Sequence, residues 1–164
     1  MPRLILMRHA KSDWLSGAAS DHDRPLNPRG QRAATALGRW LNAQALIPDT
    51  VLCSSAARTR ETLARLALAG EPQTTFTRDL YLAPAKMILQ TLRGAQGDTV
   101  LMLGHNPGIA EAAENLLSDA PQTSAFQDYP TGATLVADFN VPIWSEVDWD
   151  TGSCTAFTTP KELA

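Results

Sequence analysis

Three short apolar runs, each followed by polar residues, constrain the fold of this chain most strongly. The runs occupy residues 4–7, 50–53 and 100–103. Each is short, bounded and without polar alternation, which is typical of strands buried on both faces of a parallel sheet. Helical patterns separate them along the chain. The alternation predicts an α/β protein, a three-layer α/β/α sandwich whose central sheet is mostly parallel.

Start and stop signals place the remaining elements. Asn27 is a favourable N-cap and Pro28 suits the first helical position, so a helix is expected from there to a point before Pro48. Three further helices are expected over residues 58–69, 85–93 and 109–117. A strand is expected at 73–77, and two more, at 133–139 and 154–158, are expected to form an antiparallel C-terminal edge. Trp144 and Trp149, between these last two, are interpreted as covering a core edge, with contact to a partner as the alternative.

Composition limits the classes of protein to consider. The chain has 164 residues, enough for one domain with a sizeable core, and we expect a single domain over 1–164. Its net charge is −3 with no basic stripe, so no nucleic acid partner is expected. No apolar stretch is long enough for a signal peptide or a membrane span, which favours a cytoplasmic protein without a membrane partner. The two cysteines form no disulfide framework, and reduced thiols are expected.

Polar and cationic residues follow three of the predicted strands. They are Arg8 and His9 after the first, Ser54, Ser55 and Arg58 after the second, and His105 and Asn106 after the strand at 100–103. Because parallel strands end at one edge of a sheet, these side chains are expected to converge. Two helices begin at the same edge and add backbone N–H donors. The combination predicts a site for a phosphoryl group.

Such a site also has the means to react. An unprotonated imidazole attacks phosphorus and gives a phosphohistidine intermediate. Arg8, Arg58 and one histidine would neutralise the phosphoryl oxygens, so neither a metal nor another cofactor is expected. The neighbouring cations would also disfavour protonation of His9.

Other phosphate chemistries do not fit the sequence. It contains no Gly-x-x-x-x-Gly-Lys-Ser/Thr segment, so a P-loop is excluded. Four residues separate Cys53 from Arg58, whereas thiol phosphatases use five. No compact spacing of metal-ligating residues is present.

At these residues the sequence resembles the histidine phosphatase superfamily, which includes phosphoglycerate mutases and acid phosphatases. Arg8-His9-Ala10 corresponds to the family's Arg-His-Gly, with alanine in third place. Ser54, Arg58 and Thr62 match its second signature, and Gly104-His105 matches its late Gly-His element.

The small members that resemble phosphohistidine phosphatases carry two further signatures. Arg24-Pro25-Leu26 with Gly30 resembles one, and Pro130-Thr131-Gly132 before a strand resembles the other. The resemblance implies a phosphoglycerate mutase-like fold.

The resemblance also implies roles for five residues. His9 would carry the phosphoryl group, while Arg8, Arg58 and His105 would bind its oxygens. Arg24 would be a fourth contact, with a surface cation at the helix start as the alternative. Three residues, Ser12, Asp13 and Asn106, would border the pocket without an assigned role, and His22 is expected to be solvated.

The resemblance also bears on the substrate. Larger members carry a carboxylate, in an insertion after the third strand, that protonates the leaving oxygen, and this chain has no such insertion. Asp79 is expected to face solvent, and the remaining candidate acids are Asp13, Asp21 and Asp23. An imidazole leaving group needs a positioned acid less than an alkoxide does.

The expected function is therefore removal of the phosphoryl group from phosphohistidine on a signalling or carrier protein, with inorganic phosphate as product. Short loops without a lid would admit such a side chain. One alternative is a general small-molecule phosphomonoesterase, with a mutase less favoured. Another, from a different class, is an inactive phosphoprotein-binding module.

Overall fold

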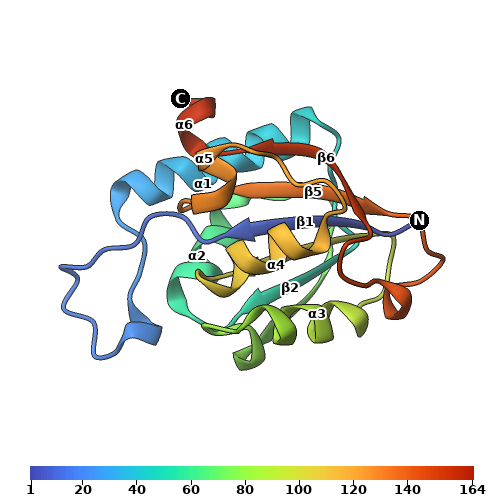
Figure 1. Ribbon diagram of the computed structural model, residues 1–164. Helices are drawn as coiled ribbons and strands as arrows, with labels where there is room; N and C mark the ends of the chain where they lie inside the picture. The colour runs from blue at the N-terminus through green and yellow to red at the C-terminus, as the bar shows by residue number, and fades with distance from the viewer.

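The computed structural model describes residues 1–164 and contains one six-stranded sheet with helices on both faces (Figure 1). The strands are β1 (Arg3–Arg8), β2 (Thr50–Ser54), β3 (Gln73–Thr77), β4 (Thr99–Gly104), β5 (Thr134–Phe139) and β6 (Gly152–Thr158). Their order is β3-β2-β4-β1-β5-β6. The first four are parallel, whereas β5 pairs antiparallel with β1 and β6. The predicted fold class and its antiparallel edge are confirmed.

The helices connect the strands in the predicted alternation. They are α1 (Pro28–Ala43), α2 (Ala57–Leu66), α3 (Ala85–Arg93), α4 (Gly108–Leu116), α5 (Ser124–Asp128) and α6 (Pro160–Leu163), with short 3-10 turns at Asp21–Asp23, Arg78–Leu80 and Trp144–Glu146. No helix combines the length and the apolar character needed to cross a bilayer.

Alternate residues of the central strands build two cores. Leu4 and Leu6 of β1 belong to the core beneath α3 and α4, and Ile5 and Met7 belong to the core beneath α1 and α2. Because side chains alternate across a strand, a continuous apolar run supplies both faces. This is why the N-terminal run has no polar alternation.

Some boundaries differ from the prediction. The second predicted helix, 58–69, ends at Leu66, because Ala67 adopts a left-handed conformation with φ 47° and stops it. The helices α5 and α6 are too short for a periodic signal and were not predicted.

Trp144 is buried and its Nε1 donates to Gly97 O at 2.7 Å, while Trp149 is half-buried against the same core. The core interpretation of both tryptophans is confirmed.

The N-terminus of α1 lies directly against the end of β1. Asn27 caps the helix by accepting from Gly30 N at 2.8 Å, as predicted. Asn27 N in turn donates to Lys11 O at 3.0 Å. A Cβ atom at position 30 would lie 2.0 Å from Lys11 O, so only glycine permits this approach. The start of α1 is thereby held against Lys11, which follows His9 by two residues.

Candidate active site

Most of the residues predicted to converge line one cavity of about 330 Å³ at the carboxyl ends of the parallel strands, whereas Ser54 and Ser55 are not part of its lining. Its lining includes the five candidate residues Arg8, His9, Arg24, Arg58 and His105, together with Lys11, Ser12, Trp14, Asp21, Leu82, Asn106 and Thr131. Asp13, in contrast, is not part of the lining. Segments distant in sequence therefore meet at the edge where the topology placed them.

One hydrogen bond determines the tautomer of His9. Its Nδ1 lies 2.6 Å from Ala10 O, and since a carbonyl oxygen only accepts, Nδ1 must carry the proton. The lone pair of the neutral ring is then on Nε2. Burial, followed by the charges of His105, Arg8 and Arg58, lowers the pKa of His9 to about 3. The ring is neutral at physiological pH, and burial contributes more than the cations that the sequence suggested.

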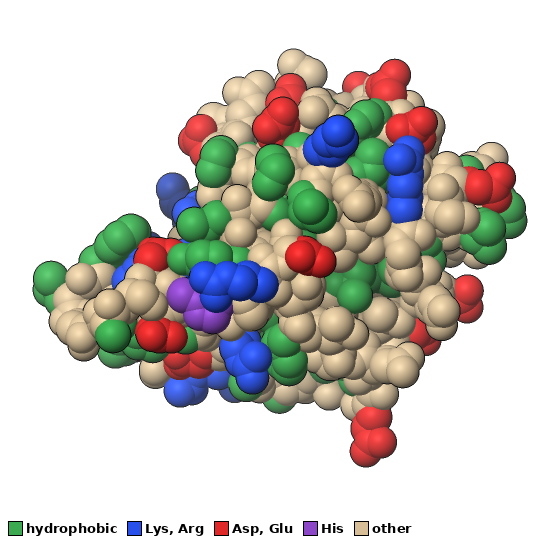
Figure 2. All heavy atoms as spheres, turned by 90° about the horizontal axis from the view of Figure 1, so that it is seen from below, with side chains coloured by type: hydrophobic (Ala, Val, Ile, Leu, Met, Phe, Trp, Pro, Cys, Tyr) green, Lys and Arg blue, Asp and Glu red, His purple; other side chains and the backbone are tan.

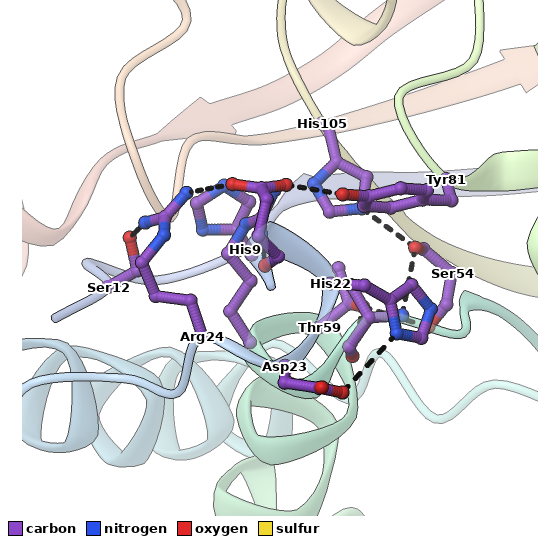
Figure 3. Close-up of polar contacts among 12 residues, drawn as sticks. His9, Ser12, His22, Asp23, Arg24, Ser54, Thr59, Tyr81 and His105 are labelled. Atoms are coloured by element: carbon purple, nitrogen blue, oxygen red, sulfur yellow. Dashed lines mark hydrogen bonds and ion pairs between the residues drawn. The ribbon is translucent and has the colours of Figure 1, made fainter. Parts of the chain in front are cut away.

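His105 faces His9, with 5.3 Å between the ring centroids. Its Nε2 lies 2.7 Å from the Ser54 hydroxyl oxygen (Figure 3), and that oxygen accepts from Ala56 N at 3.3 Å. Burial, and then Arg58, lowers the pKa of His105 to about 3. The serine that ends β2 thus orients the histidine that follows β4.

Arg8 and Asn106 are both anchored to the backbone around Tyr129. Arg8 Nη1 donates to Tyr129 O at 3.1 Å, and Asn106 Nδ2 donates to Asp128 O and Tyr129 O at 3.1 Å each. The Tyr129 ring is fully buried, and its hydroxyl donates to Leu6 O and accepts from Leu135 N. These bonds fix the floor of the cavity to the central sheet.

Asp21 holds two guanidinium groups of the cavity. Arg24 Nη2 donates to Asp21 Oδ1 at 2.8 Å, and Arg58 Nη2 donates to Oδ2 at 3.0 Å. The Tyr81 hydroxyl also donates to Oδ2. Figure 3 shows the Arg24 and Tyr81 side chains on either side of the site. The Tyr81 hydroxyl, then Arg24 and Arg58, hold the pKa of Asp21 well below its usual range, so it is ionised.

Arg24 is buried, with 7% of its surface exposed, so the alternative of a surface cation does not hold. Its Nη1 donates to the Ser12 hydroxyl, and its guanidinium carbon lies 3.5 Å from the centroid of the Trp14 ring. The first loop therefore forms a wall of the cavity.

Sequence reasoning missed the contacts of His22 and Tyr81 beside the cavity. His22 was expected to be solvated, but its Nε2 lies 2.8 Å from Ser55 Oγ and its ring lies edge-on to Tyr81, with centroids 4.8 Å apart. Tyr81 also lies edge-on to His105. On the face shown in Figure 2, histidine atoms lie beside Lys and Arg side chains at the base of a projecting segment. The hydrogen bonds of His22 and Tyr81 join residues 33 or more positions apart, so no local sequence pattern predicts them.

Of the four candidate acids, only one lines the cavity. Asp79 is exposed, as predicted, and Asp23 is exposed beside His22. Asp13 accepts from Leu15 N and turns into its own loop. Asp21 is the carboxylate that lines the cavity. Its position three residues before Arg24 was the available sequence signal, since residues three apart can pair in a helical turn.

Two other sequence interpretations are settled by burial and contacts. Burial raises the pKa of the Cys53 thiol to about 12, so it is no nucleophile.

Thr62, the last residue of the second signature, accepts from Ala10 N at 3.0 Å and donates to Arg58 O at 2.7 Å. It ties the segment after β1 to α2.

Unpartnered polar atoms gather at this cavity. Four buried side-chain atoms lack a hydrogen-bond partner, and all belong to residues of its lining: Arg8 Nε, Arg58 Nε, His105 Nδ1 and Asn106 Oδ1. Buried polar groups are usually paired, so such a concentration is typical of a binding site. No three His, Cys, Asp or Glu side chains are grouped so as to hold a metal ion.

Comparisons with known proteins place this chain in a family. The sequence model of the Histidine phosphatase superfamily (branch 1) matches residues 4–81. An uncharacterized protein of Mycobacterium tuberculosis is 35% identical over 162 residues, covering 94% of this chain and 100% of the relative. The solved structure of a candidate phosphohistidine phosphatase, SixA, from Nakamurella multipartitia is 32% identical, covers 97% of this chain and 96% of that one, and superimposes with a TM-score of 0.84. The chain belongs to the histidine phosphatase superfamily.

Within this superfamily the chain falls in the small SixA-like subgroup. The structure of the protein histidine phosphatase SixA complexed with tungstate shares the fold, with a TM-score of 0.80 at 20% identity and 99% coverage of both chains. The fold is phosphoglycerate mutase-like, as the resemblance implied.

Proposed function

We propose that this histidine phosphatase superfamily member is a phosphatase that needs no metal and removes the phosphoryl group from phosphohistidine on a protein. The observation that carries the proposal is the fixed tautomer of His9, which leaves a neutral Nε2 in a cavity lined by three arginines. A binding module would not need a neutral imidazole with a free lone pair.

In the first step, His9 Nε2 attacks phosphorus. The new N–P bond forms as the bond to the substrate imidazole breaks, and that imidazole leaves as a neutral ring after taking a proton from solvent. Water then attacks the phosphohistidine, the N–P bond breaks with its electron pair returning to His9 Nε2, and the water gives a proton to solvent as inorganic phosphate is released. The two steps balance as hydrolysis of one P–N bond.

Cationic donors stabilise the charge on the transferred group. Arg8, Arg24 and Arg58 supply guanidinium groups, and His105 supplies an N–H at Nδ1 when the Ser54 hydroxyl donates to its Nε2. Fixed donors of this kind typically contribute ~10²–10³ in rate each.

The state of Asp21 favours a phosphoramidate over a phosphomonoester. Two guanidiniums and the Tyr81 hydroxyl keep this carboxylate ionised, so it holds no proton to give to an alkoxide. An imidazole leaving group needs no such donor. The alternative, a general small-molecule phosphomonoesterase, would require Asp21 to be released and protonated.

The test compares substrates and looks for the intermediate. The protein is mixed with a phosphohistidine-bearing protein domain, with free phosphohistidine and with sugar phosphates, and phosphate release is measured. We expect the phosphohistidine substrates to react faster, an acid-labile phosphate on His9 after rapid quenching, and loss of both in His9→Ala. Faster release from sugar phosphates would contradict the substrate, and the absence of phosphorylated His9 would contradict the mechanism.

A further inference from the structure

A basic groove leads away from the phosphoryl cavity along α1. Its first part, about 310 Å³, shares Lys11 and Thr131 with the cavity and is also lined by Arg29 and Lys161. Its second part, about 370 Å³, shares Arg29 and Lys161 with the first and adds Arg32. The cavity and the two parts of the groove are therefore neighbours that share walls.

The charged side chains of this groove are of one sign. Four cationic side chains, Lys11, Arg29, Arg32 and Lys161, line it, and no Asp or Glu side chain does. All four are exposed, and none forms an ion pair or a side-chain hydrogen bond. The whole chain carries a net charge of −3, so this cluster opposes the overall balance. A surface of this kind attracts and orients a negatively charged partner.

The floor between the cations is small and apolar. Ala33 and Ala36 of α1, Ala125 and the prolines Pro130 and Pro160 form it. Arg29 and Ala33 are four residues apart, so they share one face of the helix. Short side chains flanked by long cations leave room for a polypeptide segment whose acidic side chains reach the sides.

The walls of the groove are fixed to the phosphoryl site. Gly132 N lies 3.1 Å from Arg8 O and 2.9 Å from His9 O, at the end of β1. Gly132 has φ +78°, and a Cβ atom there would lie 2.5 Å from Pro160 Cγ. The start of α6, which carries Lys161, is thus held against the backbone of His9, and Figure 1 shows α6 beside α5 near α1. A partner in the groove would have a fixed position relative to His9.

We infer that this groove docks an acidic polypeptide segment adjoining the phosphorylated side chain of the substrate protein. The inference rests on the proposed function, since it assigns a partner to the same cavity. It commits to a polypeptide rather than a small polyanion because the apolar floor extends through both parts of the groove, beyond the reach of one phosphoryl group.

The experiment measures binding separately from turnover. Two peptides carry a non-hydrolysable phosphohistidine mimic, one flanked on both sides by glutamates and the other by glutamines, and their Kd values are measured by fluorescence anisotropy at low and high salt. Exposed ion pairs typically change an affinity by a factor of about 1.5 to 5 each. We expect the acidic peptide to bind about tenfold more tightly at low salt, with the difference shrinking at high salt.

Variants assign the difference to the groove. Arg29→Ala and Lys161→Ala, alone and together, should remove most of the preference, while Arg39→Ala should keep it, because Arg39 is exposed on the same helix but does not line the groove. Hydrolysis of free phosphohistidine should stay unchanged in all of them.

Three results would overturn the inference. They are equal Kd values for the two peptides, a preference that survives both groove substitutions, and tighter binding of inorganic tripolyphosphate than of the acidic peptide. The proposed function fails separately, if the unmodified protein hydrolyses no phosphohistidine substrate. The Kd ratio still decides the groove in that case.

Discussion

The Ser54 hydroxyl lies 2.7 Å from Nε2 of His105, joining the ends of β2 and β4 across 51 positions of sequence. The contact leaves Nδ1 of the same ring without a partner. Because a histidine has two ring nitrogens, the partner of one determines what the other offers.

Ser54→Ala should therefore lower kcat for phosphohistidine by about tenfold or more, because His105 loses the group that orients it. Stopped-flow phosphate release measures the effect. Ser55→Ala is the matched control, since that neighbouring hydroxyl contacts His22 instead, and it should change kcat by less than about threefold. Equal losses in both variants would contradict a specific role for the Ser54–His105 contact.

Asp21→Asn should strengthen the binding of phosphate-like anions. The carboxylate holds Arg24 and Arg58, so its charge competes with an incoming oxyanion. We expect the inhibition constant of vanadate to fall by a factor of about 1.5 to 5, the size of one partly exposed charge contact. Asp23→Asn, in the same 3-10 turn but outside the cavity lining, is the control and should leave the constant unchanged. Weaker vanadate inhibition in Asp21→Asn would show that the carboxylate serves mainly to position the arginines.

Acid should destabilise the protein through its two buried imidazoles. The pKa values of His9 and His105 are lowered to about 3 in the folded state, against about 6.5 in an unfolded chain. Between these values the unfolded state binds more protons, so the free energy of unfolding falls as the pH falls from 6.5 towards 3. The slope is at most about 1.4 kcal/mol per pH unit for each imidazole.

Urea unfolding at a series of pH values measures this slope. His9→Gln removes one of the two groups, and its unfolding free energy should depend less steeply on pH in the same window. Identical slopes for the two proteins would mean that His9 titrates normally in the fold.

Gly132→Ala should destabilise the fold by about 1–3 kcal/mol, the usual cost of a left-handed residue with a steric conflict. Its φ is +78° and the added methyl would lie 2.5 Å from Pro160 Cγ. Gly17→Ala provides the control, because Gly17 has φ +71° but no atom within 4 Å of the added methyl. Thermal unfolding of the two variants separates the effect of strain from that of crowding. A loss at Gly132 no larger than that at Gly17 would argue against close packing of α6 on the site.

The sequence alone determined the six strands, the four longer helices and the residues at the strand ends. Continuous apolar runs predict the buried strands, and Asn27-Pro28 predicts the start of a helix. Both patterns can be recognised from the sequence because they involve residues next to one another. Parallel topology then required Arg8, Arg58 and His105 to meet at one edge, which the structure shows.

Only the tertiary structure decided the partners within the site. Asp21 meets Arg58 and Tyr81 across 37 and 60 positions, and His22 meets Ser55 across 33, because loops without periodic signals fold back over the sheet edge. The alignment of Lys11, Arg29 and Lys161 along one groove likewise depends on how α1 and α6 pack beside β1. Local spacing fixes which residues can form an element, whereas packing of distant segments fixes which side chains touch.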